Sequence, residues 1–263
     1  MRWLPGLIRF IVAIYLLPVG CMFTMHGITD DSKSWWELRR DSSEQAPTAE
    51  AADEAIIQVY AARAARWRGS VGVHTWIATK RRSEKHYTRM EVIGYSVSRG
   101  GDAVRIRVGS PDNYWFGNRP QLLRDIRGAE KVDALIERLY DAANSYPYKK
   151  IYNIWPGPNS NTFTAYLARA VPEMRLDLPS TAIGKDYVPW KQFVSKSPSG
   201  TGVQISFNGY AGLLLGLEEG IEINVLGFTA GVDLSPPALK LPAAGRIGFS
   251  DYKHFNESDL ASR

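Results

Sequence analysis

Cysteine is almost absent from the chain. Among 263 residues there is one cysteine, Cys21, and it lies inside an apolar N-terminal stretch. The rest of the chain can therefore form neither a disulfide nor a thiolate metal site, and it cannot use cysteine as a nucleophile. Histidine is scarce as well, with four residues, and no group of His, Asp and Glu has the spacing of metal ligands. We expect no metal and no other cofactor.

Long runs of one charge are also missing. The 32 Lys and Arg residues outnumber the 27 Asp and Glu residues, which gives a formal net charge of +5, but the longest basic block is Lys80–Arg82. No motif of a nucleic-acid-binding fold accompanies this charge, so we expect no nucleic-acid partner. An ordinary solvated surface and attraction to anionic lipids or envelope polymers are both compatible with the excess.

One long apolar run is present, from Phe10 to Ile28, and Arg2 and Arg9 precede it. As a helix this run is about 28 Å long, close to the thickness of the hydrocarbon layer. The pattern predicts an uncleaved transmembrane helix within residues 1–29, crossing the inner (cytoplasmic) membrane once with the body on the periplasmic side. A cleaved signal peptide and lipidation at Cys21 are the alternatives.

The remaining chain divides into a polar linker, residues 30–47, and a single extracytoplasmic domain, residues 48–263. Apolar spacing predicts an α+β fold in which helices pack on an antiparallel sheet. The expected helices cover residues 48–67 and 129–144 and a segment that begins at 160. The expected strands cover residues 71–79, 89–95, 103–108, 203–207 and 221–226.

A possible catalytic pair lies at the start of one strand and one helix. Asn159 can cap the helix, and Ser160 then lies where exposed N–H groups and the helix dipole favour negative charge. Serine needs a base, and His74 is the best-placed candidate, with Asp186 or Glu91 to orient its ring. The alternative is that Asn159 and Ser160 only cap the helix and that His74 is an ordinary core residue.

Aromatic residues could line a groove beside this pair. Trp76, Trp155 and Tyr152 flank the same segments and could hold a sugar or an acyl chain, although aromatic side chains at such positions are more often part of a core. The apolar segment from Gly209 to Gly216 is too short to span a bilayer, and we expect either a buried strand or a membrane-facing flap.

Two sequence resemblances add to these expectations. NSNTF, residues 159–163, resembles the NCxxF signature of the circularly permuted NlpC-type superfamily of papain-like proteins, which includes lecithin-retinol-acyltransferase and PPPDE types, and VHTWIATK resembles their histidine strand. This resemblance implies a permuted papain-like core with His74 as base, Ser160 in the place of the cysteine nucleophile and Asn161 in support. The longer segments VYAARAARWRG, LPSTAIGKDY and GIEINVLGFTAGVD resemble an uncharacterised family of bacterial membrane-associated proteins, a domain of unknown function.

Two functions of different classes follow. One is a membrane-anchored binding module that keeps a papain-like groove for peptidoglycan, lipid or an envelope protein. The other is a serine-dependent hydrolase or acyl/amide transferase that uses Ser160 and His74. Replacement of the thiol by a hydroxyl favours the binding module, because serine is a much weaker nucleophile than cysteine.

Overall fold

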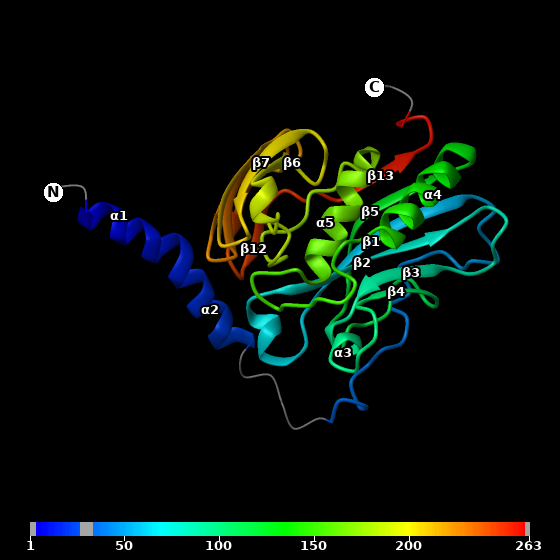
Figure 1. Ribbon diagram of the computed structural model, residues 1–263, viewed down its shortest axis with the longest axis horizontal. Coiled ribbons are helices and arrows are strands. Elements are labelled where there is room, and N and C mark those ends of the chain that lie inside the picture. The colour runs from blue at the N-terminus through cyan, green and yellow to red at the C-terminus, as the bar shows by residue number, and fades with distance from the viewer. Residues whose placement is uncertain (1–3, 27–33, 261–263) are drawn as a thin grey trace.

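Two β-sheets make up most of the structure, a computed structural model that describes residues 4–26 and 34–260 (Figure 1). One sheet has six strands and the other has seven. Helices pack on the six-stranded sheet, so the predicted α+β class is confirmed. The two sheets lie side by side in the body, and the N-terminal helical segment extends beside the second sheet (Figure 1).

The first sheet has the strand order β13-β5-β1-β2-β3-β4. Its neighbours are antiparallel except for β13, which runs parallel to β5. The predicted strands 71–79, 89–95 and 103–108 correspond to β2, β3 and β4, which pair in chain order. The strands, in chain order, are β1 (Ala55–Arg63), β2 (Val73–Lys80), β3 (Thr88–Val92), β4 (Val104–Val108), β5 (Gln121–Gly128) and β13 (Lys253–Asn256).

Strand β1 corrects the prediction of a helix over residues 48–67. The segment is an interior strand of the first sheet, and a 3₁₀ turn, η2 (Arg66–Ser70), follows it. Ile56, Ile57, Val59 and Tyr60 are fully buried, so both faces of the strand are covered. A strand buried on both faces shows a continuous apolar run rather than an alternation, and such a run can match helical spacing by chance. The β-branched and aromatic residues favour the strand.

Helices α4 (Glu130–Asn144) and α5 (Ser160–Ala170) cover one face of the first sheet, as predicted (Figure 1). A short helix, α3 (Gly94–Val97), and the 3₁₀ turn η3 (Pro172–Met174) lie in the connections. The main core forms between these helices and the sheet. Its buried members include Ile57, Val59, Ile77, Met90, Ile126, Leu135, Ile136, Leu139, Phe163 and Leu167.

The opposite face of the first sheet is covered by irregular chain. Asp112 organises this cover, because its carboxylate accepts hydrogen bonds from the Ser42 hydroxyl at 2.7 Å and from the Gln45 backbone at 2.6 Å. The described part of the predicted linker, residues 34–47, is therefore bound to the domain. The polar, aperiodic sequence of this segment correctly indicated irregular structure. It could not show that the hydroxyls of the segment donate hydrogen bonds to the buried Asp112.

The second sheet is an antiparallel meander in which each strand pairs with the next in the chain. A 3₁₀ turn, η4 (Trp190–Gln192), leads into it. Its strands are β6 (Val194–Lys196), β7 (Gly202–Phe207), β8 (Ala211–Gly216), β9 (Gly220–Val225), β10 (Phe228–Leu234), β11 (Pro237–Leu241) and β12 (Gly245–Gly248). The predicted strands 203–207 and 221–226 are confirmed as β7 and β9.

The N-terminal segment is helical in three parts, α1 (Leu4–Ile11), a π-helical turn η1 (Val12–Leu16) and α2 (Leu17–His26). The Tyr15 hydroxyl donates a hydrogen bond to the carbonyl oxygen of Ile223 on β9 at 3.0 Å. Within residues 4–26 and 34–260, no helix combines the length and the apolar character needed to cross a membrane. The predicted transmembrane helix is thus not supported, and the end of the predicted span, residues 27–28, lies outside the described residues.

Candidate functional site

His74 lies on the face of the first sheet that points away from α4 and α5. Side chains alternate between the two faces along a strand. The hydroxyl of the next residue, Thr75, lies 2.9 Å from both Asn161 Oδ1 and Thr164 Oγ1 on α5. Thr75 therefore points toward α5, and His74 and Trp76 point to the opposite side.

A buried cluster of aromatic and charged groups surrounds His74. Its Nε2 lies 3.3 Å from Glu91 Oε2, and its ring stacks on Trp115 with the ring centroids 3.7 Å apart. Arg89 donates to the same carboxylate oxygen at 2.7 Å and lies over the Trp76 ring. Glu91 is thus a partner of His74, as the sequence suggested.

The pKa values in this cluster show that the histidine is held neutral. Burial lowers the pKa of His74 and outweighs the opposing effect of Glu91. Burial alone would raise the pKa of Glu91, but the hydrogen bond from His74 and the charge of Arg89 outweigh it and hold this pKa at about 2. A neutral imidazole still donates Nε2–H to an ionised carboxylate. His74 therefore has the environment of a satisfied buried residue.

The start of α5 is built around Asn159, which forms a capping box. Its Oδ1 accepts from the backbone N–H groups of Asn161 at 2.9 Å and Thr162 at 3.2 Å, and the Thr162 hydroxyl accepts from the Asn159 backbone at 3.1 Å. Its Nδ2 donates to the carbonyl oxygens of Ile154 and Ile183, both at 3.0 Å. The predicted cap is confirmed, and it also ties the helix to two loops.

Ser160 and His74 are not brought together. Ser160 is the buried first residue of α5, on the helix-covered side of the sheet, whereas His74 points to the other side. No hydrogen bond between the two is present, although both lie in the described part of the chain. The neighbouring Asn161 instead binds β2, donating to the Val73 carbonyl oxygen at 3.0 Å. The strand–helix contact that the sequence suggested exists, but Thr75 and Asn161 make it.

Asp186 belongs to a different network from His74. Its carboxylate accepts hydrogen bonds from Gln204 at 2.8 Å and from Asn224 and Thr229, each at 2.9 Å. These donors lie on β7, β9 and β10, so Asp186 fastens the loop after α5 to the second sheet. No local sequence pattern indicates this pairing, since its members are separated by up to 43 positions.

The predicted groove-lining aromatics do not share a groove. Trp76 is fully buried, and its indole donates to the Pro111 carbonyl oxygen at 2.7 Å. Tyr152 packs against the main core on the helix-covered side. Trp155 is 46% exposed and donates to the Leu226 carbonyl oxygen, in the β9–β10 turn, at 2.7 Å. Each aromatic residue thus has a separate structural role.

A buried ionic cluster that sequence reasoning missed lies on the inner face of the second sheet. Lys240 on β11 donates to Asp177 at 2.6 Å and to Glu222 on β9 at 2.9 Å, and Lys185 forms an ion pair with the other oxygen of Glu222. Burial alone would lower the pKa of both lysines, but the neighbouring carboxylates outweigh it and raise these pKa values. Removal of one member would leave a buried charge unpaired, so the cluster fixes how the second sheet meets the body.

Asp177 is the least satisfied member of this cluster. Its Oδ1 is buried and has no hydrogen-bond partner among the described residues. Burial raises the pKa of Asp177 to about 7, against the lowering effect of Lys240. A buried carboxyl with a free oxygen can accept or donate a hydrogen bond to a bound molecule near neutral pH.

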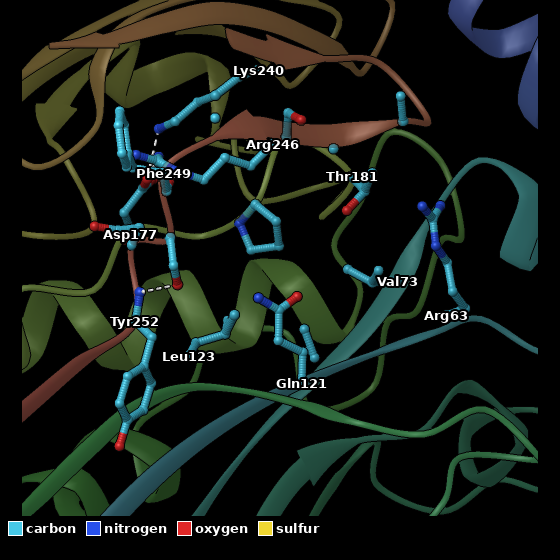
Figure 2. Close-up of a pocket in the computed structure, with 18 of the residues that line it drawn as sticks. Arg63, Val73, Gln121, Leu123, Asp177, Thr181, Lys240, Arg246, Phe249 and Tyr252 are labelled. Atoms are coloured by element: carbon cyan, nitrogen blue, oxygen red, sulfur yellow. Dashed lines mark hydrogen bonds and ion pairs between the residues drawn. The ribbon is translucent and has the colours of Figure 1, made fainter. Parts of the chain in front are cut away.

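Asp177 lines a cavity of about 370 Å³ between the two sheets (Figure 2). Figure 2 shows Lys240 and Arg246 on one side of the cavity, Leu123 and Gln121 on the opposite side and Arg63 at one end. This volume is in the range of small-molecule sites. Within the described residues, no three His, Cys, Asp or Glu side chains are grouped so that they could hold a metal ion.

The outer face of the second sheet is apolar and exposed. Six aliphatic residues oppose one another across six successive strands, and each is between 38% and 54% exposed: Val203, Leu215, Ile221, Val232, Leu239 and Ile247. A second exposed row contains Val194, Ile205, Leu213 and Ile223. The segment 209–216, for which a buried strand or a membrane-facing flap was expected, contributes β8 to this face.

The inner face of the same sheet carries the polar side chains. Buried positions that alternate with the exposed aliphatic residues are occupied by Gln204, Ser206, Glu222, Asn224, Thr229, Asp233 and Lys240. In an ordinary antiparallel sheet that packs on one side, the apolar face is inward and the polar face is solvated. The second sheet has the reverse arrangement.

Comparison with known proteins identifies a family but no described activity. Residues 54–187, just over half of the chain, match a family described only as proteins of unknown function (DUF3750). The match begins at the start of β1 and ends before the second sheet. No curated protein and no solved structure matches the chain.

Proposed function

The chain belongs to the DUF3750 family of proteins of unknown function, and we propose that it is a membrane-associated binding module whose second sheet lies with its outer face against lipid. The observation that carries the proposal is the row of six exposed aliphatic residues from Val203 to Ile247 on a sheet whose polar face is buried. Soluble monomers rarely leave so large an apolar surface open, and such surfaces mark contacts with membranes or proteins.

The N-terminal helix supports lipid as the occupant of this face. Tyr15 contacts β9 through the carbonyl oxygen of Ile223, so the helix lies against the same sheet (Figure 1). The helix itself remains exposed at Phe10, Leu16 and Leu17, with exposed fractions from 58% to 61%. Exposed apolar side chains thus lie both on the helix and on the sheet that it contacts, which suits a fluid lipid layer better than a shaped protein partner.

Two tryptophans at one end of the second sheet are consistent with a membrane boundary. Trp155 is bound to Leu226 in the β9–β10 turn, and Trp190 packs on Phe207 at the end of β7 with the ring centroids 5.8 Å apart. Trp190 is 66% exposed. Exposed indoles are enriched where the hydrocarbon layer meets the headgroups.

We place the protein on the inner membrane with its body on the periplasmic side, following the positive charge that precedes the apolar run. In this proposal the membrane, through the N-terminal helix and the second sheet, is the first partner. Peptidoglycan or an envelope protein could then contact the first sheet. The kinship with permuted papain-like proteins is proposed for the β2–α5 pair alone, on the contacts of Asn161 with Val73 and Thr75. Serine-dependent catalysis is not favoured, because His74 and Ser160 lie on different sides of the sheet.

Flotation with lipid vesicles tests the proposal. Leu215 and Ile221 are neighbours on β8 and β9 and are 49% and 43% exposed, so burial of what remains exposed contributes roughly 1 kcal/mol for each. Replacement of both residues by glutamate removes this contribution and places two charges at the contact. We expect the affinity of the full chain for vesicles of phosphatidylethanolamine and phosphatidylglycerol to fall by at least about tenfold.

The matched control is Val108→Glu, since Val108 is a 62% exposed strand residue of the first sheet. This variant should float as the unchanged protein does. Equal flotation of the Leu215→Glu/Ile221→Glu variant and the control would show that the N-terminal helix alone binds lipid, and the role of the sheet would be rejected.

A further inference from the structure

The cavity between the two sheets has more positive charge than its own carboxylates can balance. Five basic residues line it: Arg63, Arg119, Arg124, Lys240 and Arg246. Three of these are paired, since Arg124 binds Asp251 at 3.0 Å, Arg246 binds Asp233 at 2.6 Å and Lys240 binds Asp177 at 2.6 Å. Among the described residues, no carboxylate pairs with Arg63 or Arg119. Two of the five basic residues that line the cavity therefore have no carboxylate partner.

Arg63 is held in a fixed position at the end of β1. Its Nη1 donates to the carbonyl oxygens of Gly69 at 3.2 Å and Ala243 at 2.8 Å. Within the described chain, Nε and Nη2 have no hydrogen-bond partner. Burial lowers the pKa of Arg63 and no carboxylate opposes this effect, so the guanidinium pays a desolvation cost that an anion would offset. A positioned guanidinium with two free donors suits bidentate binding of a phosphate or carboxylate.

We propose that this cavity binds a phosphate-bearing small molecule, with the phosphate at Arg63 and with Arg119 as a second cation of the cavity wall. Two unpaired cations balance a phosphate dianion, whereas a carboxylate would leave one charge over. The cavity volume of about 370 Å³ is large enough for a small phosphate ester in addition to the phosphate itself. Asp177, which lines the same cavity, supplies a carboxyl group for a hydroxyl group of the ester. A free phosphate monoester and the phosphomonoester headgroup of phosphatidic acid offer this same chemistry.

Isothermal titration of the full chain in mild detergent tests the site with three probes: inorganic phosphate, glycerol 3-phosphate and short-chain phosphatidic acid. We expect at least one of the three to bind, and glycerol 3-phosphate to bind more tightly than inorganic phosphate. Arg63→Gln should weaken this binding by about tenfold or more, because hydrogen bonds to a charged group are lost. Arg63→Lys keeps the positive charge but loses the bidentate donor geometry of the guanidinium, so it should weaken binding less than Arg63→Gln does. Binding of phosphatidic acid alone would identify the source as lipid.

The control is Arg99→Gln, which removes an arginine that lies over the Tyr95 ring, outside the cavity. Melting temperatures of all variants establish that they are folded. The proposal is overturned if none of the three probes binds, or if Arg63→Gln and Arg63→Lys bind as tightly as the control. Vesicle flotation should be unchanged in Arg63→Gln, so failure of this site and failure of the membrane proposal are separate results.

Discussion

Replacement of Asn159 by alanine should destabilise the protein by more than the loss of an ordinary helix cap. The cap alone is worth about 1 kcal/mol. The Asn159 side chain also donates two partly buried hydrogen bonds, to the carbonyl oxygens of Ile154 and Ile183, each worth about 1 kcal/mol net. The Ile183 carbonyl oxygen still accepts a hydrogen bond from Asn161 Nδ2 at 2.8 Å in this variant. The Ile154 carbonyl oxygen loses its hydrogen bond from Asn159. The sum is about 3 kcal/mol.

For a domain of this size, about 3 kcal/mol lowers the melting temperature by roughly 6–12 °C. Thermal unfolding followed by circular dichroism measures this shift. Asn159→Ser is the matched variant, because serine keeps an oxygen that caps the helix but cannot donate to both loops. We expect it to lose about two thirds of what alanine loses. If alanine and serine cost the same, and no more than about 1 kcal/mol, Asn159 does not tie the helix to the loops and the reasoning is refuted.

Three further predictions concern the His74 cluster, Ser160 and topology. Folding lowers the pKa of Glu91 from 4.5 to about 2, so its stabilisation of about 3 kcal/mol is present above pH 4.5 and is lost as the pH falls toward 2. The melting temperature of Glu91→Gln should therefore fall less steeply over this pH interval than that of the unchanged protein. Parallel curves of melting temperature against pH would contradict an ionised Glu91 in the folded protein. A thiol introduced by Ser160→Cys should be alkylated no faster than an ordinary cysteine, because His74 is not beside it. Rapid alkylation at neutral pH would instead show that His74 activates residue 160. A reporter fused after Asp30, a position outside the described residues, should be active only on the periplasmic side, and activity in the cytoplasm would reverse the proposed orientation.

The two helices that the sequence predicted well carry a local signal. Helix α4 has an apolar stripe that includes Leu135, Ile136 and Leu139, and α5 has a cap that is visible in the sequence as Asn159. Both signals are local, so they need no knowledge of the fold. Strand β1 failed for the opposite reason, since burial of both faces removes the alternation by which a strand is recognised.

The apolar outer face of the second sheet and the cavity between the two sheets could not be predicted from sequence patterns. In β9 the alternation of Ile221, Glu222, Ile223 and Asn224 shows that the two faces differ, but the pattern is identical whichever face is inside. The expected pairing of His74 with Ser160 has the same limit. The positions of these residues along the chain do not show on which side of the sheet each side chain lies. The pairing of Asp177 with Lys240 joins residues 63 positions apart and depends wholly on how the sheets meet.

Contact between the outer face of the second sheet and lipid is measured most directly by site-specific fluorescence. Cys21→Ser removes the native cysteine, after which Leu215→Cys places a label on the apolar face and Val108→Cys places one on an exposed strand of the first sheet. With an environment-sensitive fluorophore, addition of phosphatidylethanolamine and phosphatidylglycerol vesicles should shift the emission of the label at position 215 to shorter wavelength and leave the label at position 108 unchanged. Quenchers attached to the acyl chains should reduce emission at position 215 alone. The same response at both positions, or no response at position 215, would contradict the account.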